Sequence, residues 1–192
     1  TRLEQGRERH PSGQVLRAIS RALQLDAYAA EHLTGLARPS GGVSSPAIWR
    51  DASEGAMRIV NNVVHAPALV ISPALDILTM NAHAQALYGD FSRADNLAYM
   101  VFLDSAARQF YVDWDNVARD TARNLRANSV SFRDDQRIAE VLGELTIQSD
   151  AFTFVWMQHD VRPRTSGVKR LRHSEVGEMS LQYDSLAVGE AP

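Results

Sequence analysis

The chain has 192 residues, of which 45% are hydrophobic and 22% are charged, and its formal net charge at pH 7 is −3. This length and composition suit one cored domain plus a smaller module, and nothing in them indicates intrinsic disorder. The absence of cysteine excludes disulfides, thiol nucleophiles and thiolate metal sites, and no apolar run approaches the roughly 18 residues that a membrane span needs.

The first part of the chain, residues 12–37, has the apolar spacing of two short helices. Ser12 can cap the first helix and Asp26 the second. The apolar residues that recur at helical spacing are Val15, Leu16, Ile19 and Leu23, followed by Ala29, Leu33 and Leu36. Residues 1–38 hold six arginines against four acids, a net charge of +2, so the remainder carries −5. A mildly basic front end suits nucleic acid, but a charge of +2 is too small to establish it.

Residues 3–7, Leu-Glu-Gln-Gly-Arg, resemble the signature that ends the recognition helix of lambda-repressor-type helix-turn-helix domains. The resemblance implies that the predicted helices are the last two of such a domain, and that its earlier helices precede Thr1 in a longer chain. A recognition helix turns polar or basic side chains toward base edges and phosphates. The candidate DNA-binding residues are Thr1, Arg2, Gln5, Arg7 and Arg9. On residue pattern alone, the alternative is a helical bundle with a solvated Arg/Glu face.

The domain boundary is predicted at residues 39–46, where Pro, Ser and Gly give the composition of a flexible linker. Residues 1–38 would then be the C-terminal part of a helix-turn-helix domain, and residues 47–192 a second domain. That domain opens with a predicted helix at 47–65, striped by Met57, Val60 and Val64. This helix would connect the two domains.

Residues 67–89 predict a β-hairpin followed by a helix. The strands, 68–72 and 75–80, are rich in Leu, Ile and Val and are separated by a Ser-Pro step. Asn81 can cap the helix and Gly89 can end it. This arrangement resembles the opening of a PAS-type sensor domain, whose sheet and helices enclose a ligand cavity. An ordinary α+β hairpin and helix is the alternative.

Three more helices are predicted between residues 113 and 159, with N-caps at Asp113, at Asp135 and at Ser149 or Asp150. Their inward faces are predicted to carry Trp114, Val117, Ala118, Thr121 and Leu125, then Ile138, Val141, Leu142 and Leu145, then Phe152, Val155 and Trp156. On the opposite face of the first helix lie Arg119, Arg123 and Arg126, which we interpret as a solvated face rather than as ligand anchors.

His159 falls on the apolar stripe of the last helix, where an imidazole without a partner would be costly. One interpretation is that its partner is a backbone carbonyl. The other is that His159, or the nearby Arg162, contacts the polar end of a ligand. Residues 165–173 and 178–188 then alternate like two strands, joined by a Ser-Glu-Val-Gly turn, and would complete one antiparallel sheet with the first hairpin. The expected fold class is α+β, with an all-helical N-terminal module followed by a PAS-like domain that has an antiparallel sheet and several helices.

Four segments of the second domain resemble the MmyB-like family of transcriptional regulators, namely residues 102–114, 117–126, 141–161 and 169–186. That family joins a lambda-repressor-type helix-turn-helix to a PAS-like ligand-binding domain. The resemblance implies a cytoplasmic regulator, away from the membrane, that binds a double-stranded DNA operator and a fatty-acid-like or other hydrophobic small molecule. The chain departs from the family pattern at Ser105 and Ser174, where the family often has Pro.

A long acyl chain needs an apolar tunnel with one polar end, because a buried carboxylate without donors is penalised. The candidate ligand-binding residues are Phe102, Leu103, Phe110, Tyr111, Trp114, Leu142 and Trp156 along the tunnel, with His159, Arg162 and Tyr111 as head-group donors. For every lining residue the alternative is plain core, which is the more common role of aromatic and aliphatic stripes at helical spacing. The competing hypothesis keeps the fold but makes the domain a protein-interaction and dimerisation module without a cavity.

The sequence carries no recognisable catalytic or metal-binding motif. None of the six histidines has metalloenzyme spacing, and no nucleophile elbow, Walker loop or dinucleotide fingerprint occurs. We therefore expect neither an enzyme nor a cofactor apart from a bound lipid, and an enzyme acting on acyl substrates is the least favoured alternative. A homodimer is expected, because helix-turn-helix heads usually read two half-sites.

Overall fold

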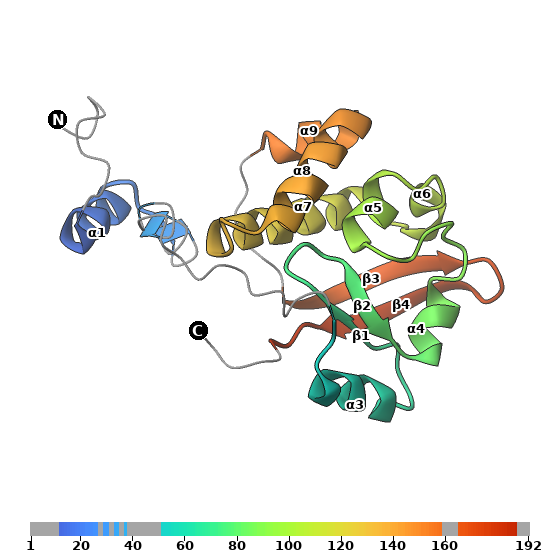
Figure 1. Ribbon diagram of the computed structural model, residues 1–192. Coiled ribbons are helices and arrows are strands. Elements are labelled where there is room, and N and C mark those ends of the chain that lie inside the picture. The colour runs from blue at the N-terminus through green and yellow to red at the C-terminus, as the bar shows by residue number, and fades with distance from the viewer. Residues whose placement is uncertain are drawn as a thin grey trace.

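The structure is a computed structural model that describes residues 12–26, 29–30, 33–34, 37, 51–158 and 165–187. Figure 1 shows the elements along the chain. The linker at 39–46, the five candidate DNA-binding residues, His159 and Arg162 lie outside the described residues, so the predictions made for them stay predictions. Within the described residues, no helix is both long and apolar enough to cross a membrane.

The N-terminal module contains α1 (Gly13–Ala22), the first helix predicted from the sequence. The Ser12 hydroxyl accepts a hydrogen bond from Val15 N at 3.5 Å, so Ser12 is the N-cap as predicted. Asp26 Oδ1 accepts one from Ala29 N at 2.9 Å and starts the next helical turn in the same way. Both caps form because a short polar side chain satisfies backbone N–H groups that the first turn leaves without partners.

The second domain opens with α3 (Glu54–Asn62), which is shorter than the predicted helix at both ends. Ser53 caps its first turn, and residues 51–53 are not helical. At the other end, the Val63 carbonyl accepts a hydrogen bond from Asn81 Nδ2 at 2.8 Å and the backbone becomes extended. Of the three apolar residues in the predicted stripe, Val60 alone is buried.

The predicted hairpin and helix follow. Strands β1 (Leu69–Ile71) and β2 (Ile77–Met80) pair antiparallel, with a bulge in β1. β2 starts later than predicted because Leu75 has a left-handed φ of 67° and belongs to the turn. Helix α4 (Ala82–Leu87) is capped by Asn81 as predicted, through a hydrogen bond from Ala84 N at 2.9 Å.

Five helices cover the next part of the domain, and their bounds are α5 (Leu97–Phe102), α6 (Ala107–Phe110), α7 (Trp114–Ser131), α8 (Gln136–Gln148) and α9 (Asp150–Trp156). Asp135 and Ser149 cap α8 and α9 as predicted. Asp113 occupies the N-cap position of α7 as predicted, but its side chain makes no capping hydrogen bond and lies 3.6 Å from the Arg170 guanidinium instead. Figure 1 shows α7 as the long helix beneath α8 and α9.

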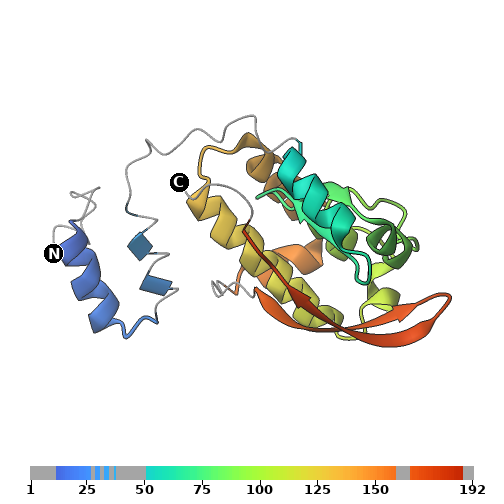
Figure 2. The ribbon, with the colours of Figure 1, turned by 90° about the horizontal axis from the view of Figure 1, so that it is seen from below.

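The second hairpin consists of β3 (Ser166–His173) and β4 (Gly177–Asp184), paired antiparallel over their full length. In Figures 1 and 2 this hairpin runs alongside α7. Its turn is fastened by Ser174, whose backbone N and hydroxyl both donate hydrogen bonds to Asp90, at 3.1 and 2.6 Å. A proline at position 174 would lose both bonds, so this departure from the family pattern has a local structural role.

The expectation of one antiparallel sheet is wrong. The described residues form two separate two-stranded sheets. β3 meets a loop on its other side, where Val112 N donates to the Arg170 carbonyl at 3.0 Å. β2 also meets a loop, through a 2.7 Å bond from Ile77 N to the Asp95 carbonyl. The edges that would have joined the two hairpins are therefore already bonded to connecting segments.

The interior consists of two apolar clusters. The first lies between the turn of the β1–β2 hairpin and α5, α7, α8 and α9, and its largest fully buried side chains are Leu125, Ile138, Val141, Leu145 and Phe152. The second lies between α5, α6, the start of α7 and β3, and includes Phe91, Met100, Phe110, Tyr111, Trp114 and Leu171. Full burial of such a side chain contributes about 1.5–3 kcal/mol, so the two clusters hold the domain together.

Candidate ligand-binding site

The sequence-predicted tunnel residues divide between the two clusters. Phe110, Tyr111 and Trp114 are buried in the second cluster, whereas Leu103, Leu142 and Trp156 are partly buried against the first. Phe102 packs against both. The structure thus brings all seven into the interior of one domain, on two sides of Phe102.

An aromatic row crosses from one cluster to the other. Phe102 meets Trp114 edge to face with ring centroids 6.0 Å apart, and it meets Phe152 in the same way at 5.1 Å. Phe152 stacks on Trp156 at 5.3 Å. The row Trp114–Phe102–Phe152–Trp156 therefore runs from α7 through α5 to α9 as a continuous apolar path, and it ends beside the arginines of α7.

Tyr111, one of the predicted head-group donors, lies deep in the second cluster. Its ring is 4.9 Å from that of Phe110 and 6.1 Å from that of Phe91. Burial raises the pKa of Tyr111 well above its usual value, with a smaller contribution from nearby Tyr88. The phenol is therefore neutral at physiological pH, so it would donate a hydrogen bond to a ligand without contributing charge.

A narrow groove separates α7 from α9. Its lining residues are Arg119, Ala122, Arg123 and Arg126 on α7, Val155 on α9 and Gln158 just after α9. The cavity volume there is about 10 Å³, which is about the space for one water molecule. The groove adjoins the predicted head-group residues in sequence, since Gln158 immediately precedes His159.

The prediction that the three arginines form a solvated face is wrong. Arg126 is only 7% exposed, and the Arg123 side chain is 20% exposed. The reason is tertiary, because α9 covers this side of α7 and long arginine side chains lie flat against the apolar surface that it brings.

Each arginine is held by specific contacts. The Arg126 guanidinium lies 4.2 Å from the centre of the Trp156 ring and donates a hydrogen bond to the Trp156 carbonyl. Arg123 pairs with Asp120 at 2.8 Å, and Arg119 donates to Asn116 Oδ1 at 2.7 Å.

A fourth cation, Lys169 of β3, faces α7 from the side of the second hairpin. Its ammonium lies 4.7 Å from the centre of the Tyr183 ring. Burial lowers the pKa of Lys169, while the charge of Asp120 acts in the opposite direction. Lys169 and Asp120 do not line the groove, whose charged lining residues are Arg119, Arg123 and Arg126.

Comparison with known protein families gives one match. The family model described as the MmyB-like transcription regulator ligand binding domain matches residues 52–192, which is 141 of the 192 residues. The chain belongs to the MmyB-like transcription regulator family. The resemblance noted in the sequence is thereby confirmed. None of the curated proteins compared with the chain matches it.

Membership of the MmyB-like family identifies residues 52–192 as the ligand-binding domain of a transcription regulator. The family match begins after the N-terminal module, and that module's recognition signature at residues 3–7 lies outside the described residues. The assignment of that module to a helix-turn-helix therefore stays a prediction.

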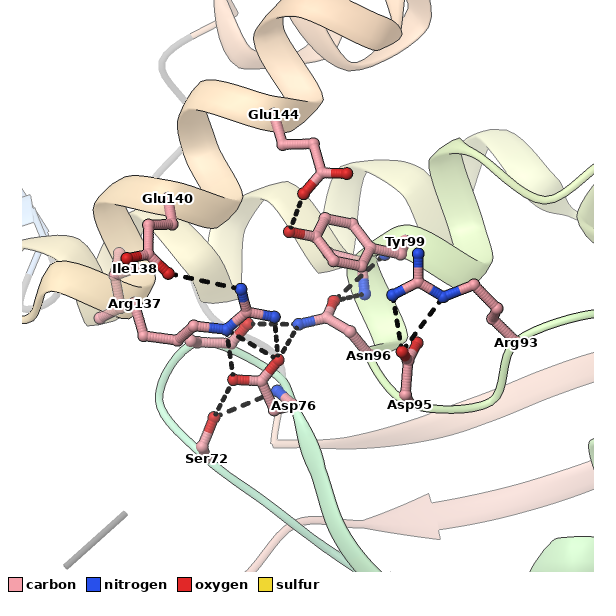
Figure 3. Close-up of polar contacts among 12 residues, drawn as sticks. Ser72, Asp76, Arg93, Asp95, Asn96, Tyr99, Arg137, Ile138, Glu140 and Glu144 are labelled. Carbon is pink, nitrogen blue, oxygen red and sulfur yellow. Dashed lines mark hydrogen bonds and ion pairs between the residues drawn. The ribbon is translucent and has the colours of Figure 1, made fainter. Parts of the chain in front are cut away.

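The MmyB-like domain also contains a polar network that sequence analysis missed (Figure 3). Asp76, at the end of the first turn, accepts hydrogen bonds from Arg137 on α8, Nε to Oδ2 at 3.0 Å and Nη2 to Oδ1 at 2.7 Å. The buried Asn96 donates to Asp76 Oδ1 at 2.8 Å and to the Ala74 carbonyl at 2.9 Å. Burial acts to raise the pKa of Asp76, but the hydrogen bonds from Arg137 and Asn96 outweigh it and lower the pKa.

Tyr99 completes this network. Its hydroxyl donates to Glu144 on α8 at 2.6 Å, and the guanidinium groups of Arg93 and Arg137 lie 5.6 and 5.8 Å from its ring centre. Burial, followed by the hydrogen bond to Glu144, raises the pKa of Tyr99 to about 12. Because Asp76 balances Arg137 and Asp95 balances Arg93 at 2.6 Å, we assign the network a structural role. It fastens α8 to α5 and to the first hairpin.

One sequence signal for this network exists, namely an acid at position 76 inside an otherwise apolar strand segment. Its partner Arg137 lies 61 residues away, and spacing gives no hint of that pairing. The structure also locates no metal site, since no group of three or more His, Asp or Glu residues within the described part of the chain could hold a metal ion.

Proposed function

We propose that the chain is a ligand-responsive, DNA-binding transcriptional regulator whose PAS-like domain binds a fatty-acid-like or other hydrophobic small molecule. It would act in the cytoplasm as a homodimer on a double-stranded operator, and not as an enzyme. The observation that carries the proposal is the family match over residues 52–192. The predicted helix-turn-helix signature at residues 3–7 supports the DNA-binding part.

The aromatic row gives the hydrophobic ligand a physical basis. Ligand pockets usually enclose roughly 300–1,000 Å³, far more than the groove between α7 and α9 holds in this structure. A ligand must therefore part these helices and open the row at Phe152 and Trp156. Each buried CH₂ group of the ligand would contribute about 0.8 kcal/mol, so an acyl chain of ten carbons brings enough free energy to offset the parting of a short helix.

α9 is the element best suited to move. It has seven residues, and the side chains of Phe154 on it and of Met157 directly after it are 69% and 67% exposed. α8, in contrast, is held by Arg137 and Glu144 through the polar network. Ligand can act on DNA affinity only if it binds one arrangement of the domain better than another, and a displaced α9 would supply that second arrangement.

The test measures binding of the full chain to its own promoter region by fluorescence anisotropy at several salt concentrations. We expect binding that weakens as salt rises, because arginines would displace counterions from phosphates. Replacing Arg2 and Arg7 with Ala should abolish it, whereas replacing the exposed Arg58 of α3, which pairs with Glu54, should not. Absence of any salt-dependent DNA binding would refute the DNA-binding part.

A second candidate function is a protein-interaction module without a small-molecule cavity. The observation that favours it is the close packing of the predicted lining residues against one another. Native mass spectrometry of the purified chain separates the two functions. Retained lipid, or a rise in melting temperature on adding lipid, supports the ligand-binding function, and a lipid-free mass without such a rise supports the interaction module.

A further inference from the structure

We propose that Lys169 is a site of covalent modification, where its amine is acetylated by a small activated acyl donor of the acyl phosphate class. Lys169 is the only lysine among the 20 lysine and arginine residues of the chain. An arginine side chain stays protonated at physiological pH, whereas a lysine can lose its proton and act as a nucleophile. This modification is independent of the ligand-binding function proposed above.

Lys169 lies on the inner face of β3, where the neighbouring side chains are apolar or absent. Residues two positions apart in a strand share a face, so its neighbours there are Gly167 and Leu171, and Leu171 is 3% exposed. Its cross-strand partner Leu181 packs against the second apolar cluster. Lys169 is therefore partly buried, whereas Val168 beside it, on the outer face, is 66% exposed.

The ammonium group of Lys169 contacts an aromatic ring instead of an acid. Its Nζ lies 4.7 Å from the centre of the Tyr183 ring. This ring can lie across β3 because residue 167 is glycine, where a Cβ would come within 3.2 Å of Tyr183 Cε1. Within the part of the chain that the structure describes, Lys169 makes no hydrogen bond and no ion pair. Its charge is therefore stabilised only by the ring and by more distant charges.

The charges that face Lys169 from α7 offset its own charge only in part. Asp120 attracts the ammonium electrostatically, but the carboxylate of Asp120 also pairs with the Arg123 guanidinium at 2.8 Å, so one negative charge is shared between two cations. Burial is the larger influence and lowers the pKa of Lys169. A larger fraction of its amine is therefore neutral at a given pH than in an exposed lysine, and only the neutral amine attacks an acyl group.

The proposed reaction transfers an acetyl group from phosphate to nitrogen. The Lys169 nitrogen attacks the carbonyl carbon of the acyl phosphate, an N–C bond forms, and the bond from that carbon to the phosphate oxygen breaks. Phosphate leaves with the electron pair, and the amine gives a proton to water. The product is a neutral amide, which removes the charge that Asp120 attracts and the cation that contacts Tyr183. Acetylation would thus change the contact between the second hairpin and α7.

The experiment measures the rate at which acetyl phosphate acetylates the full chain at about pH 7.5, by intact mass spectrometry, with peptide mapping to separate Lys169 from the terminal amine. Nα-acetyl-lysine amide in the same solution gives the rate for an ordinary lysine amine. We expect Lys169 to react at least about threefold faster than this amide, because a larger fraction of its amine is neutral.

The matched control is the double variant Lys169→Arg with Val168→Lys, which moves the only lysine by one position to the exposed outer face of the same strand. This variant should react at the rate of the free amide, and thermal melts check that it keeps its fold. The comparison of the unmodified chain with the free amide does not depend on the variant.

Two outcomes would overturn the inference. If Lys169 reacts no faster than the free amide, or carries no adduct, burial shields the amine instead of activating it. If the double variant reacts as fast as Lys169, the inward placement does not set the rate. Neither outcome bears on the proposed ligand-binding function.

Discussion

Replacing Asn96 with Ala is expected to destabilise the ligand-binding domain more than replacing most single polar residues. The Asn96 side chain is only 1% exposed and makes four hydrogen bonds. Its oxygen accepts from Ala98 N and Tyr99 N at the start of α5, and its nitrogen donates to the Ala74 carbonyl and to Asp76. Asn96 is therefore at once a helix cap and the link between α5 and the first hairpin.

The magnitude follows from these contacts. Loss of a cap costs about 1 kcal/mol, and each of the two donated hydrogen bonds contributes about 1 kcal/mol. Asn96→Ala should thus lower the free energy of unfolding by about 3 kcal/mol. Asn96→Asp keeps the cap but replaces the amide donor with a carboxylate that faces Asp76. Repulsion between the two carboxylates should then lower the free energy of unfolding by a similar amount.

Urea denaturation followed by tryptophan fluorescence measures this loss, because Trp114 lies in the second apolar cluster and Trp156 packs against the first. The matched control is Asn62→Ala on α3, since Asn62 is exposed and its side chain donates to the Arg58 carbonyl at 2.8 Å. That substitution should cost less than about 0.5 kcal/mol. If Asn96→Ala costs no more than Asn62→Ala, the linking role assigned to Asn96 is wrong.

Four further substitutions test other parts of the domain. The pKa of Asp76 is lowered in the folded domain, so the ionised carboxylate stabilises the fold fully at pH values above the unfolded-state pKa of 3.8. This stabilisation is lost as the pH falls through the folded-state pKa. The difference in melting temperature between the unmodified chain and Asp76→Asn should therefore shrink in acid. Tyr99→Phe should lower the free energy of unfolding by about 1 kcal/mol at pH 7. The pKa of Tyr99 is raised from 10 in the folded domain, so the stabilisation by its hydroxyl is complete below pH 10 and is lost as the pH rises toward 12. Thermal melts should therefore show the difference between Tyr99→Phe and the unmodified chain fading over that range. Gly177→Ala should cost about 1 kcal/mol in urea melts, because φ is +78° there although its surroundings are open. Gly143→Ala should stabilise by about 0.5–1 kcal/mol in the same assay, because this exposed helical glycine also has open surroundings.

The features that the sequence predicts correctly depend on contacts within a few residues. Ser12, Asn81, Asp135 and Ser149 all cap helices where expected, because each cap bonds a backbone N–H two or three positions ahead. Turn residues likewise locate both hairpins. These interactions need no knowledge of the rest of the chain.

The features that the sequence does not predict depend on partners far away. Asp113 has the residue type of a cap, but Arg170 is a competing partner that only the docking of β3 brings near. Arg126 lies on the polar side of an isolated α7, yet the packing of α9 brings Trp156 over it. The single predicted sheet fails for the same reason, because loops bond to the strand edges first.

The contacts that hold α8 differ in kind from those that hold α9, and this difference bears on how the domain could respond to a ligand. α8 is fastened by charged hydrogen bonds to segments on both sides of it, through Asp76 and Tyr99. α9 is joined to α7 mainly through apolar packing, together with Arg126, which covers the Trp156 ring and donates one hydrogen bond to the Trp156 carbonyl. Hydrocarbon from a ligand can replace apolar packing at little cost, whereas it cannot replace charged hydrogen bonds. A ligand that replaces the apolar packing between α7 and α9 should therefore leave α8 in place, and the proposed movement would be that of α9.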